Sequence, residues 1–98
     1  MLYEALLKVN DHSVVRLNYA VALAMAGKVN AAMQQLGPLD TDLEFYHPFY
    51  IARAEFKVMQ DQSADAVRDL HRASRLTRNP QERRYIEHRI NNLSLAAE

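Results

Sequence analysis

Histidines are the first residues in this sequence that could do chemistry, because a neutral imidazole binds metal ions and exchanges protons near neutral pH. The chain has four of them, His12, His47, His71 and His88, and no cysteine. No two histidines lie four residues apart on a helix, and no HExxH motif or cysteine companion is present, although metal sites are usually built from such spacings. We therefore expect no metal site and no cofactor.

Paired carboxylates are the next candidates, since two neighbouring acids can divide the roles of proton donor and acceptor. Asp40 and Asp42 form such a pair, but they lie in a polar stretch whose composition is typical of a turn. The sequence also lacks a glycine-rich phosphate loop and a nucleophile motif. We expect no enzymatic activity.

A basic stripe is predicted on one helix, where Arg68, Arg72 and Arg75 recur at i, i+4 and i+7. Asp65 and Asp69 precede two of these arginines by three residues, which favours ion pairs on the helix surface. Twelve basic and twelve acidic residues leave the chain without a net charge, so direct DNA binding is not expected. We expect a solvated face, with contact to DNA or to another domain as the alternatives.

The stretch FYHPFYIARAEF holds five of the eight aromatic residues. It is either a stacking platform for a ring-shaped ligand or the packed start of a helix. The helical spacing favours the second interpretation. It predicts that Phe49, Tyr50 and Phe56 fill the joints between repeated helical hairpins, and that Phe45 and Tyr46 cover the end of the preceding hairpin.

The elements that position these residues are predicted to be helices throughout. Only two glycines and three prolines occur in 98 residues, and no segment alternates with a period of two. We therefore expect an all-α fold in a single domain over residues 1–98. The longest apolar run, residues 19–26, is far short of the roughly 20 residues that cross a bilayer, and the N-terminus does not read as a signal peptide. A cytoplasmic protein without membrane contact is expected.

Helix boundaries follow from capping residues and from helix breakers. Ser13 and Ser63 are predicted N-caps, Gly27 is a predicted C-terminal stop, and Asn79 with Pro80 begins the last helix. About six helices result, at 1–10, 13–26, 29–36, 46 or 47 to 59 or 60, 64–77 and 80–93.

One internal period relates three apolar positions and one turn: Ala20 and Ala54, Ala32 and Ala66, Leu36 and Leu70, and Gly27 and Asp61. The interval between the members of each pair equals the length of the tetratricopeptide repeat (TPR), in which small residues let two helices of a hairpin approach closely. The period predicts TPR-like antiparallel hairpins in a right-handed superhelix. The predicted units are a partial B helix at 1–10, repeat one at 13–46, repeat two at 47–78 and a capping helix at 79–94.

A partner-binding groove is predicted along the first helices of the two repeats. Arg16 and Asn18 are polar residues in an otherwise apolar helix, which predicts that the helix is sandwiched. Their role is either hydrogen bonding to a neighbouring loop or contact with a peptide. The candidate partner-binding residues are Arg16, Leu17, Asn18, Val21, Ile51, Glu55 and Val58, with Ala24 beside them.

Several short motifs carry a resemblance to a known family: Val15-Arg16-Leu17-Asn18 followed by Ala20-Val21-Ala22, the pair Arg53-Ala54, and Leu76-Thr77 with Asn79-Pro80 and Glu82-Arg83. Nearly the whole chain resembles the C-terminal extension found in a group of bacterial extracytoplasmic-function (ECF) RNA polymerase sigma factors. In that family the extension is TPR-like and follows the two domains that bind core polymerase and promoter DNA. Neither of those domains lies in the present sequence.

The resemblance therefore implies only the role of the extension. That role is non-catalytic control of transcription initiation through protein contacts. The implied partners are the chain's own or separate sigma-factor domains in the RNA polymerase context, or a small YCII-related protein. Two alternatives stay open: a free-standing TPR-like adaptor or homo-oligomerising fragment, and an accessory nucleic-acid contact through the arginine-rich C-terminal helices.

Overall fold

The computed structural model describes residues 11–96, and the helix predicted over residues 1–10 lies outside this range. Within it the chain is all-α, as predicted, and no strand is present. There are five α-helices in this range, against the six or so expected for the chain. The elements are α2 (Asp11–Met25), α3 (Val29–Leu36), the short 3₁₀ helix η1 (Gly37–Leu39), α4 (His47–Met59), α5 (Ser63–Leu76) and α6 (Pro80–Ala96).

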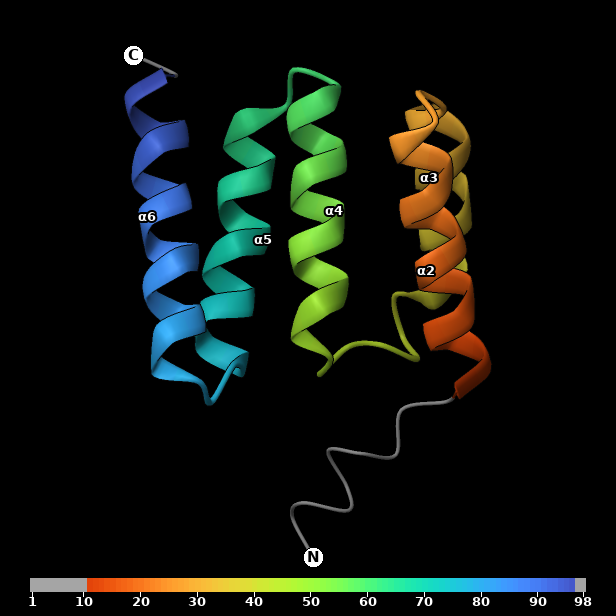
Figure 1. Ribbon diagram of the computed structural model, residues 1–98, viewed down its shortest axis with the longest axis horizontal. Coiled ribbons are helices and arrows are strands. Elements are labelled where there is room, and N and C mark those ends of the chain that lie inside the picture. Colours follow the sequence, from red (N-terminus) through yellow and green to blue (C-terminus); the bar gives the residue numbers. More distant parts are fainter. Residues whose placement is uncertain (1–10, 97–98) are drawn as a thin grey trace, which may run out of the picture.

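The helices form consecutive antiparallel neighbours (Figure 1). Helix α2 packs against α3, α4 packs against α5, and α5 also packs against α6. The pair α2–α3 lies at one end of the molecule and α6 lies at the other. The range 13–46 contains most of α2 together with α3 and η1, 47–78 contains α4 and α5, and 79–94 falls on α6. That these ranges are repeat units stays a prediction.

The turn between α2 and α3 is built around Gly27, whose φ of +85° lies in the left-handed region. The amide of Gly27 donates to the carbonyl of Ala24 at 2.9 Å, and the amide of Lys28 donates to the carbonyl of Leu23 at 2.9 Å. These are the two bonds of a Schellman motif, which satisfies carbonyls that the helix end leaves without partners. The sequence prediction that Gly27 ends the helix is confirmed.

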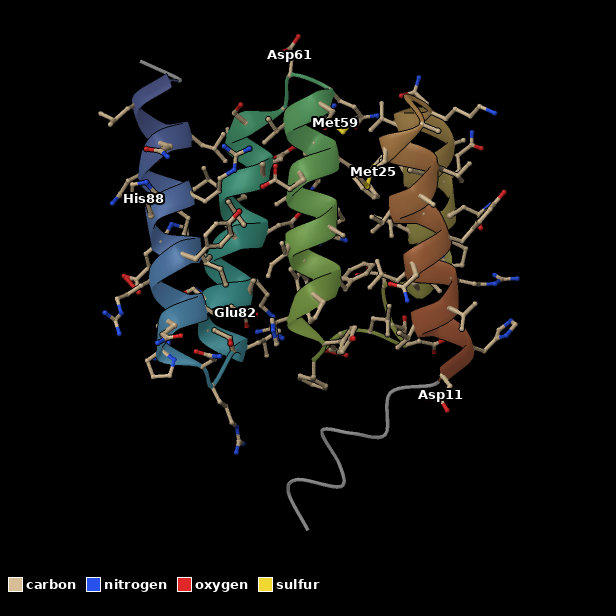
Figure 2. All side chains as sticks on the ribbon, in the orientation of Figure 1. Asp11, Met25, Met59, Asp61, Glu82 and His88 are labelled. Carbon is tan, nitrogen blue, oxygen red and sulfur yellow. The ribbon has the colours of Figure 1, made fainter. Side chains whose placement is uncertain are left out.

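The turn between α4 and α5 repeats this geometry at the equivalent position of the second hairpin. Asp61 has a φ of +60°, its amide donates to the carbonyl of Val58, and the amide of Gln62 donates to the carbonyl of Lys57. Figure 2 shows Asp61 at the tip of this turn. The core follows the same interval, because both members of each of these pairs are buried: Ala20 and Ala54, Ala32 and Ala66, Leu36 and Leu70.

The two turns give a matched prediction. Gly27→Ala should lower the free energy of unfolding by about 1 kcal/mol, because a Cβ disfavours a positive φ. Asp61→Gly should raise it by up to about 1 kcal/mol for the same reason. A Cβ on Gly27 meets no atom within 4 Å, so the change acts through the backbone alone. Urea unfolding of both variants checks the pair, and shifts in the same direction would contradict it.

Two predicted N-caps are wrong. Ser13 lies inside α2 and is buried, and its Oγ donates to Oδ2 of Asp42 at 3.0 Å, so it ties α2 to the connection that follows η1. Ser63 is the first residue of α5, and Gln62 takes the N-cap position without a side-chain hydrogen bond. The short Schellman turn accounts for this, since Gln62 both closes α4 and precedes α5.

The sequence suggested a polar connection between α3 and α4, but the structure shows that part of this connection is apolar and buried. Gly37 does not stop the helix abruptly, because its backbone is still helical and the chain continues into η1. Leu39 and Leu43 are buried in the core, and the amide of Leu43 donates to the carbonyl of Leu39 at 2.9 Å. The polar residues Asp40 and Asp42 lie on the exposed side of this turn.

Helix α6 begins at the cap that the sequence predicts. Oδ1 of Asn79 accepts hydrogen bonds from the amides of Gln81 and Glu82 at 2.9 and 3.2 Å. The Glu82 carboxylate does not reach back to the Asn79 amide directly. It accepts from the hydroxyl of Thr77, whose Oγ1 in turn accepts from the Asn79 amide.

Asn79→Ala should lower the free energy of unfolding by about 1 kcal/mol, because two amides at the start of α6 lose their acceptor. Gln81→Ala is the matched control, since Gln81 is exposed in the same turn. Thermal or urea unfolding followed by circular dichroism measures both. Equal stability of the two variants would show that the cap contributes nothing.

Arg83, in the first turn of α6, donates hydrogen bonds to carbonyls at the end of α5. Its Nε donates to the carbonyl of Ser74 at 3.1 Å, and its Nη2 donates to the carbonyl of Thr77 at 2.7 Å. These carbonyls belong to the C-terminal end of α5, which favours a cation. The hydrogen bonds between residues 74 and 83 therefore join the end of α5 to the start of α6.

Candidate partner-binding surface

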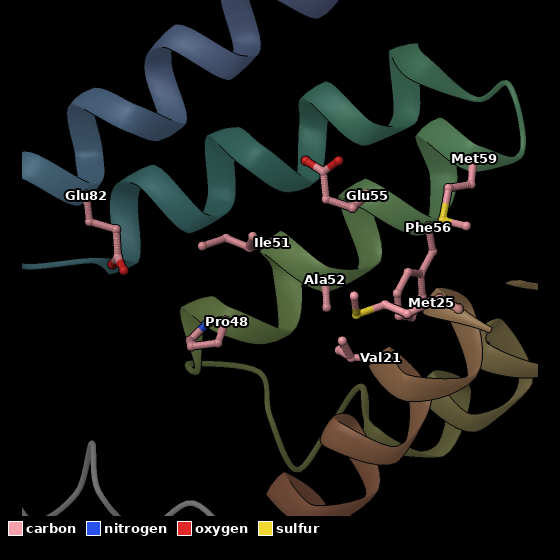
Figure 3. Close-up of a pocket in the computed structure, with 10 residues that line it drawn as sticks. Val21, Met25, Pro48, Ile51, Ala52, Glu55, Phe56, Met59 and Glu82 are labelled. Carbon is pink, nitrogen blue, oxygen red and sulfur yellow. The ribbon is translucent and has the colours of Figure 1, made fainter. Parts of the chain in front are cut away.

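A hollow of about 550 Å³ lies between α2 and α4 (Figure 3). Its wall is mainly apolar. It is lined by Val21, Ala24, Met25, Pro48, Ile51, Ala52, Glu55, Phe56, Met59 and Glu82. We call it the α2–α4 hollow.

Helical spacing places the lining residues on one side of α4. Pro48, Ile51, Glu55 and Met59 recur every three or four residues, so they share one face of the helix. Pro48 is tolerated because it lies in the first turn, where its missing N–H would have no partner in the helix. The hollow is thus built on regular helices and not on loops, since α2 and α4 supply most of its lining and α6 supplies Glu82.

Two methionines lie at the rim. Met25 is 84% exposed and Met59 is 52% exposed, and Figure 2 shows them on the facing sides of α2 and α4. They are separated by the same interval as Gly27 and Asp61 and so occupy equivalent positions in the two hairpins. Methionine side chains adapt to irregular apolar surfaces, which makes them common at sites that accept varied partners.

The two acidic residues of the hollow are already paired within the chain. Both oxygens of Glu55 accept from Arg89, at 2.9 Å from Nε and 2.8 Å from Nη2, and this hydrogen bonding raises the pKa of Arg89 above its ordinary value. Oε1 of Glu82 lies 2.6 Å from Nε2 of His47 and also accepts from Thr77. The hollow therefore offers an apolar surface to a partner, and its two carboxylates already have partners within the chain.

Three of the predicted partner-binding residues, Val21, Ile51 and Glu55, line the hollow. Val58 is half-buried on α4 and packs against the core. Leu17 is buried in the core, so its side chain does not form part of an accessible surface. Ile51 and Glu55 thus share an accessible face of α4, whereas Leu17 lies on the buried side of α2, and partner binding at this face stays a prediction.

Arg16 and Asn18 do not have the predicted surroundings. Both are exposed on α2, as are Val15 and Tyr19. The prediction that α2 is sandwiched between other elements is therefore wrong for the part of the chain that the structure describes. One face of the helix packs on the core and the other is open.

The predicted basic stripe is interrupted at Arg72, whose surroundings differ from those of Arg68 and Arg75. Arg68 is exposed beside Asp65, 3.7 Å away, as the spacing suggested. The guanidinium of Arg72 lies over the rings of Phe45 and Tyr50, at 5.9 and 5.8 Å from their centroids. Arg75 is exposed. The stripe is thus not a continuous set of free cations. Phe45 is 59% exposed, and its ring lies against the guanidinium of Arg72.

Phe49, Tyr50 and Phe56 are buried, as predicted. The ring of Phe49 meets that of Tyr50 edge to face at 5.2 Å. The Tyr50 hydroxyl donates to the carbonyl of Glu44 at 2.7 Å and so ties α4 to the turn before it. With both rings packed in this way, the stretch is a helix start and not an open stacking platform.

A buried ionic cluster between α4 and α5 was not predicted. Asp69 is 5% exposed. It accepts hydrogen bonds from Arg53 at 2.8 and 3.0 Å and forms a salt bridge with Lys57, whose Nζ lies 2.9 Å from Oδ2. The hydrogen bond to Asp69 raises the pKa of Arg53 above its ordinary value. The predicted pairing of Asp69 with Arg72 is wrong, because Asp69 faces α4. The sequence feature that could have indicated this cluster is the position of Arg53, which follows Phe49 by four residues and Tyr50 by three.

No group of three or more acidic, histidine or cysteine residues within residues 11–96 could hold a metal ion. No helix in this range combines the length and hydropathy needed to cross a bilayer. Comparisons with protein-family models, with curated proteins and with solved structures find no match to this chain.

Proposed function

We propose that this chain is a non-catalytic protein-interaction module of TPR-like helical hairpins, and that it acts as the C-terminal regulatory domain of an ECF sigma factor in the control of transcription initiation. The observation that carries the proposal is the α2–α4 hollow. It is apolar, open, rimmed by Met25 and Met59, and placed on two helices of equivalent position. Such a surface suits an apolar segment of another protein.

The sigma-factor part of the proposal rests on the sequence resemblance and not on the geometry. The partner is then one of the two sigma-factor domains, of the same or a separate polypeptide, in the RNA polymerase context, or a small YCII-related protein. The compartment is the cytoplasm.

Four of the eight arginines between residues 47 and 96 are engaged within the fold, whereas Arg68, Arg75, Arg78 and Arg84 are exposed. Arg53, Arg83 and Arg89 are held by carboxylates or helix carbonyls, and Arg72 lies over two rings. Binding to DNA depends on basic side chains that are free to neutralise phosphates. These four cations of α4 to α6 are thus occupied by roles in the fold.

The test is a pair of titrations with the fluorescently labelled chain. One uses the two-domain fragment of the cognate sigma factor and the other uses duplex promoter DNA. We expect saturable binding of the fragment with little dependence on salt. Tight DNA binding that falls steeply with salt would overturn the proposal.

Variants locate the site. Ala52→Arg places a charged side chain in the hollow and should weaken binding of the fragment about tenfold or more. Asn91→Arg adds the same charge on the exposed side of α6 and should leave binding unchanged. Circular dichroism verifies that both variants stay folded. Equal affinities of the two variants would contradict the assignment of the hollow.

A further inference from the structure

Two large apolar side chains are exposed together on α2. Val15 is 64% exposed and Tyr19 is 55% exposed. They lie four residues apart and therefore share one face of the helix. We call these two residues the α2 outer face. An exposed pair of this kind is typical of a contact surface.

On α4 and α6 the equivalent face contacts the element that comes just before it in the chain. Arg53 of α4 lies 3.5 Å from Asp40, which follows η1. Arg83 of α6 donates to the carbonyl of Ser74, near the end of α5, at 3.1 Å. Asp40 and Ser74 are separated by the interval of the internal period, so the two contacts end at equivalent positions of successive units.

The period carries both contacts back to the start of the chain. The equivalent positions are Tyr19 and Arg53, Val15 and Arg83, and Leu6 with both Asp40 and Ser74. The period therefore assigns Leu6 to the place beside the α2 outer face. The later units use charged or polar groups at this contact, whereas Leu6, Val15 and Tyr19 are all apolar, so the two sides match in chemistry.

The sequence before α2 has the apolar spacing that such a contact requires. Leu2, Ala5 and Val9 follow one another at intervals of three and four residues, as on one side of a helix. Their equivalents in both later units are at most 2% exposed: Leu36, Leu39 and Leu43, and then Leu70, Ala73 and Thr77. Leu7 is instead equivalent to Thr41 and Arg75, which are exposed. The period thus distinguishes a buried side of this segment from an exposed one.

We propose that residues 2–9 form a helix that packs on the α2 outer face of the same chain, with Leu6 against Val15 and Tyr19. Helix α2 begins at Asp11, so this contact closes only a short loop and costs little chain entropy. In this arrangement the outer face of α2 is occupied by the chain itself. The α2–α4 hollow, which other residues of α2 line, stays open to a partner.

A second copy of the chain is the competing occupant, since α6 exposes Tyr85 and Leu95 at the other end of the molecule. The internal period argues against it. Helix α6 is equivalent to α2 and α4, whereas the element that precedes such a face in the later units is equivalent to α3 or α5. The segment before α2 has that equivalence and α6 does not.

Nuclear magnetic resonance of the full chain tests the contact directly. We expect nuclear Overhauser effects between the methyl groups of Leu6 and the ring of Tyr19. A sample that mixes isotope-labelled with unlabelled chains shows whether the two residues belong to one molecule. Absence of these effects would overturn the proposal. Effects that arise only between chains, or that join Tyr19 to Leu95 of a second copy, would overturn it as well.

A matched pair of variants tests the same contact through stability. Leu2→Asp places a carboxylate where the equivalents Leu36 and Leu70 are each 1% exposed, and it should lower the urea midpoint of unfolding by about 1 M. Leu7→Asp makes the same change at a position whose equivalents are exposed and should leave the midpoint unchanged. Equal midpoints, or a larger loss from Leu7→Asp, would contradict the proposal. Neither measurement involves a partner, so the proposed function stands or falls separately.

Discussion

Replacing Asp69 with alanine should lower the free energy of unfolding by about 3 kcal/mol, among the largest effects expected in this chain. Asp69 is almost fully buried between α4 and α5, where it accepts hydrogen bonds from Arg53 at 2.8 and 3.0 Å and forms a salt bridge with Lys57 at 2.9 Å. Its removal leaves Lys57 without this partner and leaves Arg53 with only Asp40, 3.5 Å away, while both cations stay half-buried. Urea unfolding at neutral pH measures the loss.

Asp65→Ala is the control for this prediction, since Asp65 lies one turn earlier on the same helix. Its partner Arg68 is 3.7 Å away, and both side chains are at least half exposed. An exposed pair of this kind contributes less than about 1 kcal/mol. If both variants unfold at the same urea concentration, the cluster around Asp69 does not stabilise the α4–α5 pair.

Phe49→Ala should lower the free energy of unfolding by about 3–5 kcal/mol, because it leaves a cavity where α4 begins. The Phe49 side chain is completely buried. Its ring contacts Tyr50 edge to face, and the guanidinium of Arg53 lies 4.9 Å from its centroid. The variant therefore loses apolar burial and part of the support of Arg53.

Phe45→Ala provides the comparison within the same aromatic stretch. Phe45 is mostly exposed and contacts Arg72, so its loss should change stability by no more than about 1 kcal/mol. Thermal unfolding of the two variants separates a helix core from an exposed platform. A larger effect from Phe45 than from Phe49 would reverse the structural roles assigned to the two rings.

Local signals in the sequence predicted the helices well. Gly27 and Asn79 act through backbone geometry and side-chain caps within a few residues of their own position, so their effects can be read from the sequence alone. The internal period was equally accessible, because it depends on buried alanines and leucines whose spacing the fold repeats. The prediction that Ile51 and Glu55 share one face of α4 also came from this period.

Long-range pairing was not accessible in the same way. Asp69 could pair with Arg72 on its own helix or with Arg53 on another, and only the packing of α4 on α5 decides between them. The role of Ser13 was missed for a similar reason, since its partner Asp42 is distant in the sequence. The rim methionines were missed because methionine spacing alone does not distinguish a core residue from an exposed one.

The central claim is that this chain binds another protein through the hollow between α2 and α4. The most direct test is nuclear magnetic resonance of the ¹⁵N-labelled chain during titration with the two-domain sigma fragment. The account predicts that amide shifts saturate and cluster at Val21, Ile51, Ala52 and the residues around them. Shifts confined to α5 and α6, or no saturable shift at all, would contradict it.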